Sequence, residues 1–318
     1  MLFALLTLVW LFPPASRAQT YPAKTVRYIV PFPPGGSPDI IARLIAERFS
    51  RMWGQQVVVD NRSGAGGTVG GAIAAKSPAD GYTLFQCNSA SSAIAESLYK
   101  KLPYDHQRDF APLSLIGTSP NVLVVHPSLP ARSVKEFIAY ARANPGKLSY
   151  GTSAAGTSGQ LAMELFKLTA RIEVVHIAYK GAMQALSDVI GGQIPSSMQS
   201  APGALSAIET GRVRALAVTS LKRIPQLPAV PTMHEAGLPG FEVNAWYGLC
   251  APVATPAPIL DKVHADLVAV LRIPEVQQRF GDLVIQIAPT TREEFAKFIR
   301  DETARWAKVI KAAGIPQE

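Results

Sequence analysis

A short strand that passes through a glycine-containing loop into a helix is the feature that most constrains this chain. The β-branched and aromatic run Val26–Val30 is typical of a buried strand. Gly35 and Gly36 follow it, and Ser37 is predicted to cap a helix whose apolar face continues to Gly54. Backbone N–H groups at such a helix start are unpaired and lie at the positive end of the helix dipole, so they attract anions. The stretch therefore outlines an anion site, although a tight turn with nothing bound would have the same pattern.

The N-terminus has the pattern of a secretory signal peptide. An apolar run over residues 2–12 precedes two prolines and the small-residue pattern Ser16-Arg17-Ala18, which suits cleavage before Gln19. No Lys or Arg precedes the run, which departs from the usual pattern. The alternative is a membrane anchor, but the run is much shorter than the ~20 residues that a membrane span requires. We expect residues 1–18 to be removed and the mature protein to be soluble and exported to the periplasm.

Strand and helix patterns alternate along the rest of the chain, which predicts parallel α/β sheets. A second unit begins near Ser119 and repeats the strand–loop–helix pattern of residues 26–54. It has a strand over residues 148–151, a polar loop, and a helix that Thr157 and Gln160 would open as a capping box. Other strands are expected at residues 56–60, 82–87, 113–116, 122–125, 173–177, 214–218 and 243–251, and closing helices at residues 258–272 and 291–311.

Charge and motifs argue against nucleic-acid binding and catalysis. The formal net charge is +8, but the lysines and arginines are scattered and form no basic run. The five histidines are far apart and form no H-x-x-x-H pair, so no metal is expected. The hydrolase motif G-x-S-x-G is absent. Gly64, Gly66 and Gly70 resemble a dinucleotide fingerprint, but they follow the second strand rather than the first. We therefore expect no catalytic residues, no metal and no cofactor.

Short motifs occur in order over essentially the whole mature chain. They are Val30-Pro31-Phe32-Pro33-Pro34-Gly35-Gly36 with Asp39, Asn61-Arg62, Asp80-Gly81-Tyr82-Thr83-Leu84, Tyr179-Lys180-Gly181, Ala215-Leu216-Ala217-Val218-Thr219-Ser220 and Trp246-Tyr247-Gly248. Together they resemble the Bug family, the extracytoplasmic solute receptors of tripartite tricarboxylate transporters. A match of this length and order is highly specific.

The resemblance implies an α/β fold of the periplasmic-binding-protein type II kind. Two doubly wound α/β domains would be joined by two crossing strands and would close on a ligand between them. Residues 21–118 and 246–318 would form the first domain, and residues 119–245 the second.

Two positions depart from the family's pattern. Gln160 stands where the family commonly has His, and Pro195 and Gln199 stand where acidic residues often follow Gly-Gly-Gln. We expect the ligand to differ from those of the relatives in the part that lies away from the shared carboxylate.

The function that the resemblance implies is that of a periplasmic receptor, not an enzyme. It would capture a small organic carboxylate and deliver it to membrane subunits of a tripartite tricarboxylate-type transporter, as a monomer and without nucleic acid. One alternative is a sensor or orphan receptor that signals the presence of a carboxylate to a membrane partner. Another is a nucleotide- or phosphate-binding enzyme, which the absence of a nucleophile, a metal set and a fingerprint disfavours.

One carboxylate of the ligand is expected to lie between backbone N–H groups at two helix starts, one in each domain. No Arg or Lys lies in either loop, so recognition would rest on neutral donors and helix dipoles, with Lys180 and Arg62 as the nearest cations. Asp39 is not expected to touch the carboxylate, because two like charges in close contact repel. It would instead brace the helix start or meet a ligand hydroxyl, amine or bridging water. The predicted ligand-binding residues are Phe32, Gly35, Gly36, Ser37, Asp39, Asn88, Ser89, Ser153, Ala154, Gly156, Thr157, Ser158, Lys180 and Gln199.

Cys87 and Cys250 are the only cysteines. In the sheet that the resemblance implies, the strands that carry them would lie side by side, but a disulfide requires Cβ atoms roughly 3.5–4.5 Å apart. We expect two free, buried thiols.

Overall fold

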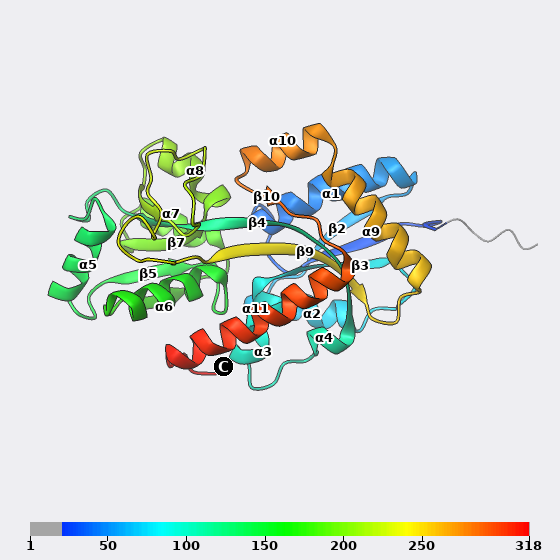
Figure 1. Ribbon diagram of the computed structural model, residues 1–318, viewed down its shortest axis with the longest axis horizontal. Coiled ribbons are helices and arrows are strands. Elements are labelled where there is room, and N and C mark those ends of the chain that lie inside the picture. Colours follow the sequence, from blue (N-terminus) through cyan, green and yellow to red (C-terminus); the bar gives the residue numbers. More distant parts are fainter. Residues whose placement is uncertain (1–20, 318) are drawn as a thin grey trace, which may run out of the picture.

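Ten strands form one curled, mixed sheet that runs through both halves of the molecule (Figure 1). The computed structural model describes residues 21–317. Neighbouring strands follow the order β2-β1-β3-β9-β4-β7-β5-β6, and β8 and β10 each pair with β4. The strands are β1 (Val26–Val30), β2 (Val57–Asn61), β3 (Thr83–Asn88), β4 (Phe110–Val125), β5 (Ser149–Thr152), β6 (Val175–Ala178), β7 (Ser196–Ser200), β8 (Arg214–Val218), β9 (Asn244–Pro252) and β10 (Gln286–Ile287).

Helices cover the sheet on both faces and bury its apolar side chains in separate clusters. They are α1 (Ser37–Trp53), η1 (Ala65–Gly67), α2 (Thr68–Ala75), η2 (Ala90–Ile94), α3 (Ala95–Leu98), α4 (His106–Asp109), α5 (Val134–Ala143), α6 (Ser158–Ala170), α7 (Ala182–Ile190), α8 (Ala201–Glu209), α9 (Ala257–Leu271), α10 (Pro274–Asp282) and α11 (Arg292–Ala312). The last helix, α11, opens with a capping box between Thr291 and Glu294.

Each half contains a parallel core, as the alternation of strands and helices predicts. In one half β1 lies between β2 and β3 and is parallel to both. In the other half β5 lies between β6 and β7 and is parallel to both. The strands β4 and β9 are antiparallel to each other and cross between the halves (Figure 1). The predicted α/β fold class with two crossing strands is confirmed.

One prediction about these crossing strands was wrong. The strands expected at residues 113–116 and 122–125 are parts of a single strand, β4, which has 16 residues. Gly117 and Pro120 between them are typical of a turn. The chain stays extended there because it exchanges one partner for another: pairing with β9 continues to Pro120, and pairing with β7 begins at Asn121.

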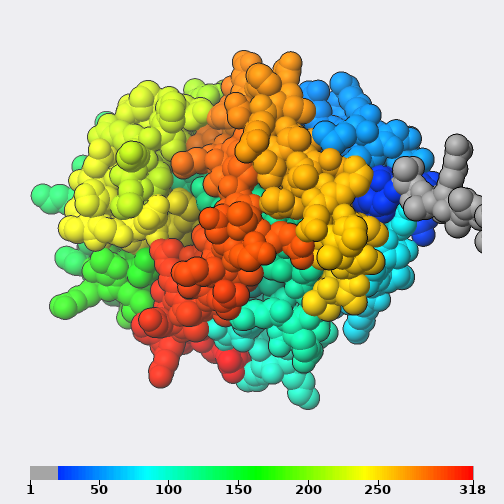
Figure 2. Space-filling model, turned by 45° about the vertical axis from the view of Figure 1, so that its right-hand side comes forward, coloured from blue at the N-terminus to red at the C-terminus, as the bar shows by residue number. Residues whose placement is uncertain are grey.

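The helix α11 packs against both halves. It contacts η2 and α3 on one side and α6 on the other. Its Phe295 and Trp306 are completely buried, and Figure 2 shows the helix as a red band between the green and cyan parts of the surface. Gly248 on β9 leaves room for it, because a Cβ at that position would overlap the Phe295 ring. The C-terminal helix therefore covers the junction of the two halves.

Within residues 21–317, none of the helices combines the length and the apolar character that a membrane span needs. The predicted signal peptide, residues 1–18, lies outside the described residues.

Candidate functional site

A cavity of about 280 Å³ lies between the loop that follows β1 and the loop that follows β5. Among the predicted binding residues, Ala154 lines a neighbouring crevice, and Gly35, Asp39 and Gly156 line neither space. The structure brings the other predicted residues together around the cavity: Phe32, Gly36, Ser37, Asn88, Ser89, Ser153, Thr157, Ser158, Lys180 and Gln199.

The first loop is held by Asp39, the third residue of α1. Its carboxylate accepts hydrogen bonds from the Gly35 N–H at 3.0 Å, from Arg43 Nε at 2.9 Å and from Asn61 Nδ2 at 3.0 Å. Burial opposes the charged form, but these hydrogen bonds outweigh it and lower the pKa of Asp39. Asp39 therefore braces the start of α1, and the Gly35 N–H is already occupied.

The start of α1 has no side-chain cap. Gly36, rather than the predicted Ser37, is the N-cap residue. Ser37 is the first helical residue, and its Oγ lies 3.1 Å from Oγ of Ser200 in the other half of the molecule. Burial raises the pKa of the nearby Tyr247 to about 12, so its phenol keeps its proton beside Ser37. Neutral hydroxyl groups and backbone N–H groups therefore surround this corner of the cavity.

The second loop leads into α6, where the predicted capping box does not form. Thr157 is the N-cap residue, but its Oγ1 donates to the Ala154 carbonyl at 3.0 Å. The Gln160 side chain, which should have reached the N-cap, accepts the Gly156 N–H at 2.7 Å. The prediction was wrong because both side chains bind the preceding loop instead of the helix. As in α1, the first turn is left without a side-chain cap.

Two further helices begin at the cavity, and the sequence reasoning missed both. The helix α7 follows Gly181, and α8 follows Ser200. Neither has a side-chain cap or an acidic residue in its first turn. Signals for both are present in the sequence, since Gly181 ends the Tyr179-Lys180-Gly181 motif and Pro202 is typical of a first helical turn. Four helices, α1, α6, α7 and α8, therefore start at one cavity.

The side chains around the cavity add no negative charge. Among the described residues that line it there is no Asp or Glu, and Lys180 is the one Lys or Arg. Arg62, the other cation named from the sequence, does not line it and pairs with Asp60 at 2.9 Å. Four helix N-termini and one lysine are an environment that favours an anion.

Amide side chains complete the walls and are themselves held in place. Asn88 Oδ1 accepts the N–H groups of Ala90 at 3.0 Å and Ser91 at 3.2 Å, which fixes the start of η2. Gln199 Nε2 donates to Ser197 Oγ at 2.6 Å and so lies along β7. Both amides therefore present a defined orientation to the cavity.

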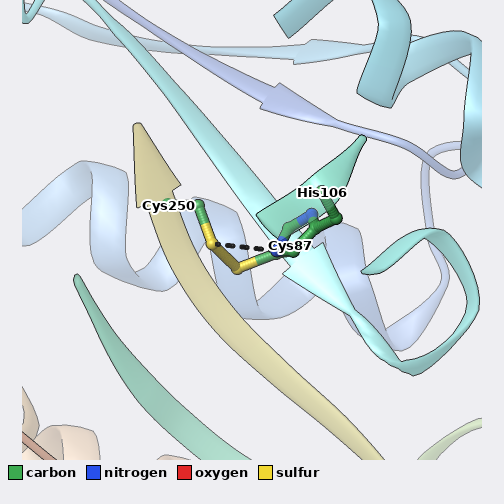
Figure 3. A group of neighbouring side chains, drawn as sticks. All are labelled: Cys87, His106 and Cys250. Carbon is green, nitrogen blue, oxygen red and sulfur yellow. Dashed lines mark hydrogen bonds between the residues drawn. A yellow bond between two sulfur atoms is a disulfide. The ribbon is translucent and has the colours of Figure 1, made fainter. Parts of the chain in front are cut away.

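Cys87 and Cys250 form a disulfide, which corrects the expectation of free thiols (Figure 3). Their Cα atoms are 6.0 Å apart, and both side chains are completely buried on the same face of the sheet. Strand order alone could place β3 beside β9 but could not show that the two side chains share a face. His106 Nε2 lies 3.9 Å from Cys250 Sγ, and burial lowers the pKa of His106 to about 3, so its ring is neutral. The bond joins β3 to β9 directly before Asn88.

The sequence and the fold of this chain match those of known proteins. The family described as "Tripartite tricarboxylate transporter family receptor" matches residues 41–315. Protein BugT of Bordetella pertussis is 39% identical over 298 residues, which cover 93% of this chain and 91% of BugT. The structure of R. palustris Rpa4515 with adipate superposes with a TM-score of 0.91 at 37% identity and covers 94% of this chain and 100% of that one. The periplasmic binding protein BugD superposes with a TM-score of 0.88 at 33% identity, over 94% of this chain and 100% of its own.

Proposed function

This chain belongs to the tripartite tricarboxylate transporter family of receptors, and we propose that it captures a small organic carboxylate in the periplasm and delivers it to a membrane transporter of that type. Its structural neighbours are solute-binding receptors rather than enzymes, and members of the family are periplasmic binding proteins.

The convergence of four helix starts on one cavity carries this proposal. The helices α1, α6, α7 and α8 all lack a side-chain cap, so N–H groups of their first turns have no side-chain partner. An anion in the cavity would supply that partner and would lie at the positive end of each dipole. A carboxylate is the simplest organic group that accepts several such hydrogen bonds at once.

The rest of the cavity suits a small hydrocarbon body. Phe32, Met183 and Met198 line it together with several prolines, and such apolar walls favour a ligand with an apolar part. A cavity of about 280 Å³ lies at the small end of ligand-binding pockets, so it suits a small ligand. The relative that was solved with adipate supports a carboxylate with a short chain.

We propose that the two halves are domains that close on the ligand. One would consist of residues 21–118 with 246–318, and the other of residues 119–245. The strands β4 and β9 cross between them and would form the hinge. The hydrogen bond between Ser37 and Ser200 across the cavity supports a closed arrangement in which both domains touch the same ligand.

Thermal denaturation of the purified protein with a panel of small carboxylates tests the ligand class. We expect at least one mono-, di- or tricarboxylate to raise the Tm at pH 7, since a ligand at a hundredfold excess over its Kd stabilises the folded state by about 2.7 kcal/mol. The matching amides, which have the same shape without the charge, should not raise it. Equal shifts from amides or sugars would count against an anion site. Lost uptake of the same carboxylate in cells that lack the gene would separate delivery to a transporter from sensing.

A further inference from the structure

The loop before α6 is held by a chain of hydrogen bonds that passes through a histidine. Gln160 Oε1 accepts the Gly156 N–H at 2.7 Å, and Gln160 Nε2 lies 3.2 Å from Nδ1 of His176 on β6. The other ring nitrogen of His176 lies 2.7 Å from Thr152 Oγ1, which donates to the Ala154 carbonyl at 2.9 Å. Both ends of this series of hydrogen bonds, at Gly156 and at Ala154, therefore reach the loop that borders the cavity.

These partners assign both the charge and the tautomer of His176. Because the Gly156 N–H donates to Oε1 of Gln160, the amide nitrogen of Gln160 must donate to Nδ1 of His176. The Thr152 hydroxyl gives its proton to a carbonyl, so it accepts from Nε2–H of His176. A neutral imidazole with its proton on Nε2 satisfies every partner, whereas an imidazolium would place two donors face to face at Gln160.

The groups that face His176 are consistent with a neutral ring. The Tyr150 ring stacks on the imidazole with centroids 4.9 Å apart, and the Tyr150 hydroxyl donates to Glu164 at 2.7 Å. Glu164 pairs with Lys167 at 2.8 Å, so these two charges on α6 compensate each other. Burial outweighs the attraction of Glu164 and lowers the pKa of His176 to about 4.

The loop before α1 in the other half has the same geometry. Asp39 and Gln160 are each the third residue of their helix, and each binds the N–H of a glycine four positions earlier. Both glycines have a positive φ, 83° at Gly35 and 70° at Gly156, a conformation that favours glycine. The loop before α1 and the loop before α6 therefore share the same hydrogen-bonding geometry.

The two halves differ in the charge of that support. Asp39 is held by Asn61 on the neighbouring strand β2, and Arg43 compensates its negative charge. Gln160 is held by His176 on the neighbouring strand β6, and both groups are neutral. The second loop therefore obtains the same shape without a carboxylate and without a compensating cation.

We propose that Gln160 and His176 are positioning residues that hold the loop before α6 open to an anion without adding negative charge to the site. This inference rests on the proposed carboxylate site, because the first turn of α6 can bind an anion only while the loop keeps this shape. Two variants separate shape from charge. Gln160→Met keeps the volume and loses both hydrogen bonds, and Gln160→Glu keeps the bond to Gly156 but adds a carboxylate.

The first measurement needs no ligand. In Gln160→Met we expect the Gly156 amide to exchange with solvent roughly tenfold faster than in the wild type, because it loses its one side-chain acceptor. The wild-type His176 ring should show the nitrogen chemical shifts of the Nε2–H tautomer. Gln278→Glu, on the exposed side of α10, is the matched control and should change neither quantity.

The second measurement is the pH dependence of adipate binding between about pH 6 and 8, where wild-type His176 stays neutral. We expect wild-type affinity to be nearly constant and Gln160→Met affinity to be lower by roughly tenfold at every pH. In Gln160→Glu the new carboxylate raises the pKa of His176, so the pair is neutral at low pH and negative at high pH. Affinity of that variant should therefore fall as pH rises, and His176→Asn added to it should remove the slope.

Two results would overturn the positioning role while leaving the proposed function intact. One is a Gly156 amide that exchanges at the wild-type rate in folded Gln160→Met. The other is a Gln160→Glu variant whose adipate affinity has no slope with pH. If the wild type does not bind adipate, Gly156 exchange and the His176 tautomer still decide the inference, and the carboxylate panel decides the function separately.

Discussion

Replacing Cys87 and Cys250 together by alanine is expected to lower the free energy of unfolding by up to about 5 kcal/mol. The disulfide joins residues separated by 163 positions in the sequence, and so long a closed loop removes much conformational freedom from the unfolded chain. Both side chains are also completely buried, so the smaller alanines leave unfilled space in the core. Chemical denaturation followed by tryptophan fluorescence measures the loss.

The wild type under reducing conditions is the control for this prediction. Its unfolding midpoint with a dithiol present in the denaturant should approach that of the double variant, because the unfolded chain exposes the bond to reduction. The unreduced wild type should have a mass lower by two hydrogens than the reduced protein. Two free thiols in the unreduced protein would contradict the disulfide, and a double variant as stable as the wild type would contradict its stabilising effect.

Replacing Gly36 by valine is expected to weaken carboxylate binding by roughly a hundredfold or more, since a hydrogen bond to a charged group contributes about 1.5–3 kcal/mol and several are involved. Gly36 is the N-cap of α1 and lines the cavity. A bulky side chain there would stand over the uncapped N–H groups of the first turn. Titration calorimetry with the carboxylate that gives the largest thermal shift measures the loss.

The fold itself should tolerate this substitution. The backbone at Gly36 has φ −82° and ψ 167°, which valine adopts readily. An added Cβ would meet only Pro38 Cδ at 3.6 Å and the Pro33 carbonyl oxygen at 3.8 Å, which are ordinary contacts. Gly281→Val on the surface of α10, where nothing lies within 4 Å of an added Cβ, is the matched control. Wild-type affinity in a folded Gly36→Val protein would mean that the carboxylate does not lie at the start of α1.

The parts of the site that are local in sequence could be predicted. The strand Val26–Val30, the glycine pair and the helix that ends at Gly54 are set by neighbouring residues, so local rules predict them, although the N-cap is Gly36 and not Ser37. Of the groups that hold Asp39, Gly35 and Arg43 lie within four residues of it, whereas Asn61 on β2 is distant in sequence and was not predicted. The turn-like sequence around Gly117 and Pro120 misled the prediction because partners far along the chain keep that segment extended.

The parts that depend on distant residues could not be predicted. The Thr157 and Gln160 pattern predicts a capping box, but Gln160 turns instead to Gly156 and His176. The partner of Gln160 is His176 on β6, a strand that begins 15 residues later, so rules based on neighbouring residues cannot predict this contact. The starts of α7 and α8 were missed for the same reason, because only the folded sheet brings them to the cavity.

Mass spectrometry of the small molecule that is released when the protein is denatured tests the carboxylate site most directly. The protein should be purified from the periplasm of its own cells without refolding, so that its natural ligand remains bound. We expect a small organic acid, with at least one carboxylate and a short apolar chain, in an amount comparable to that of the protein. A nucleotide, a sugar or an amine without a carboxylate in that amount would contradict the proposed function.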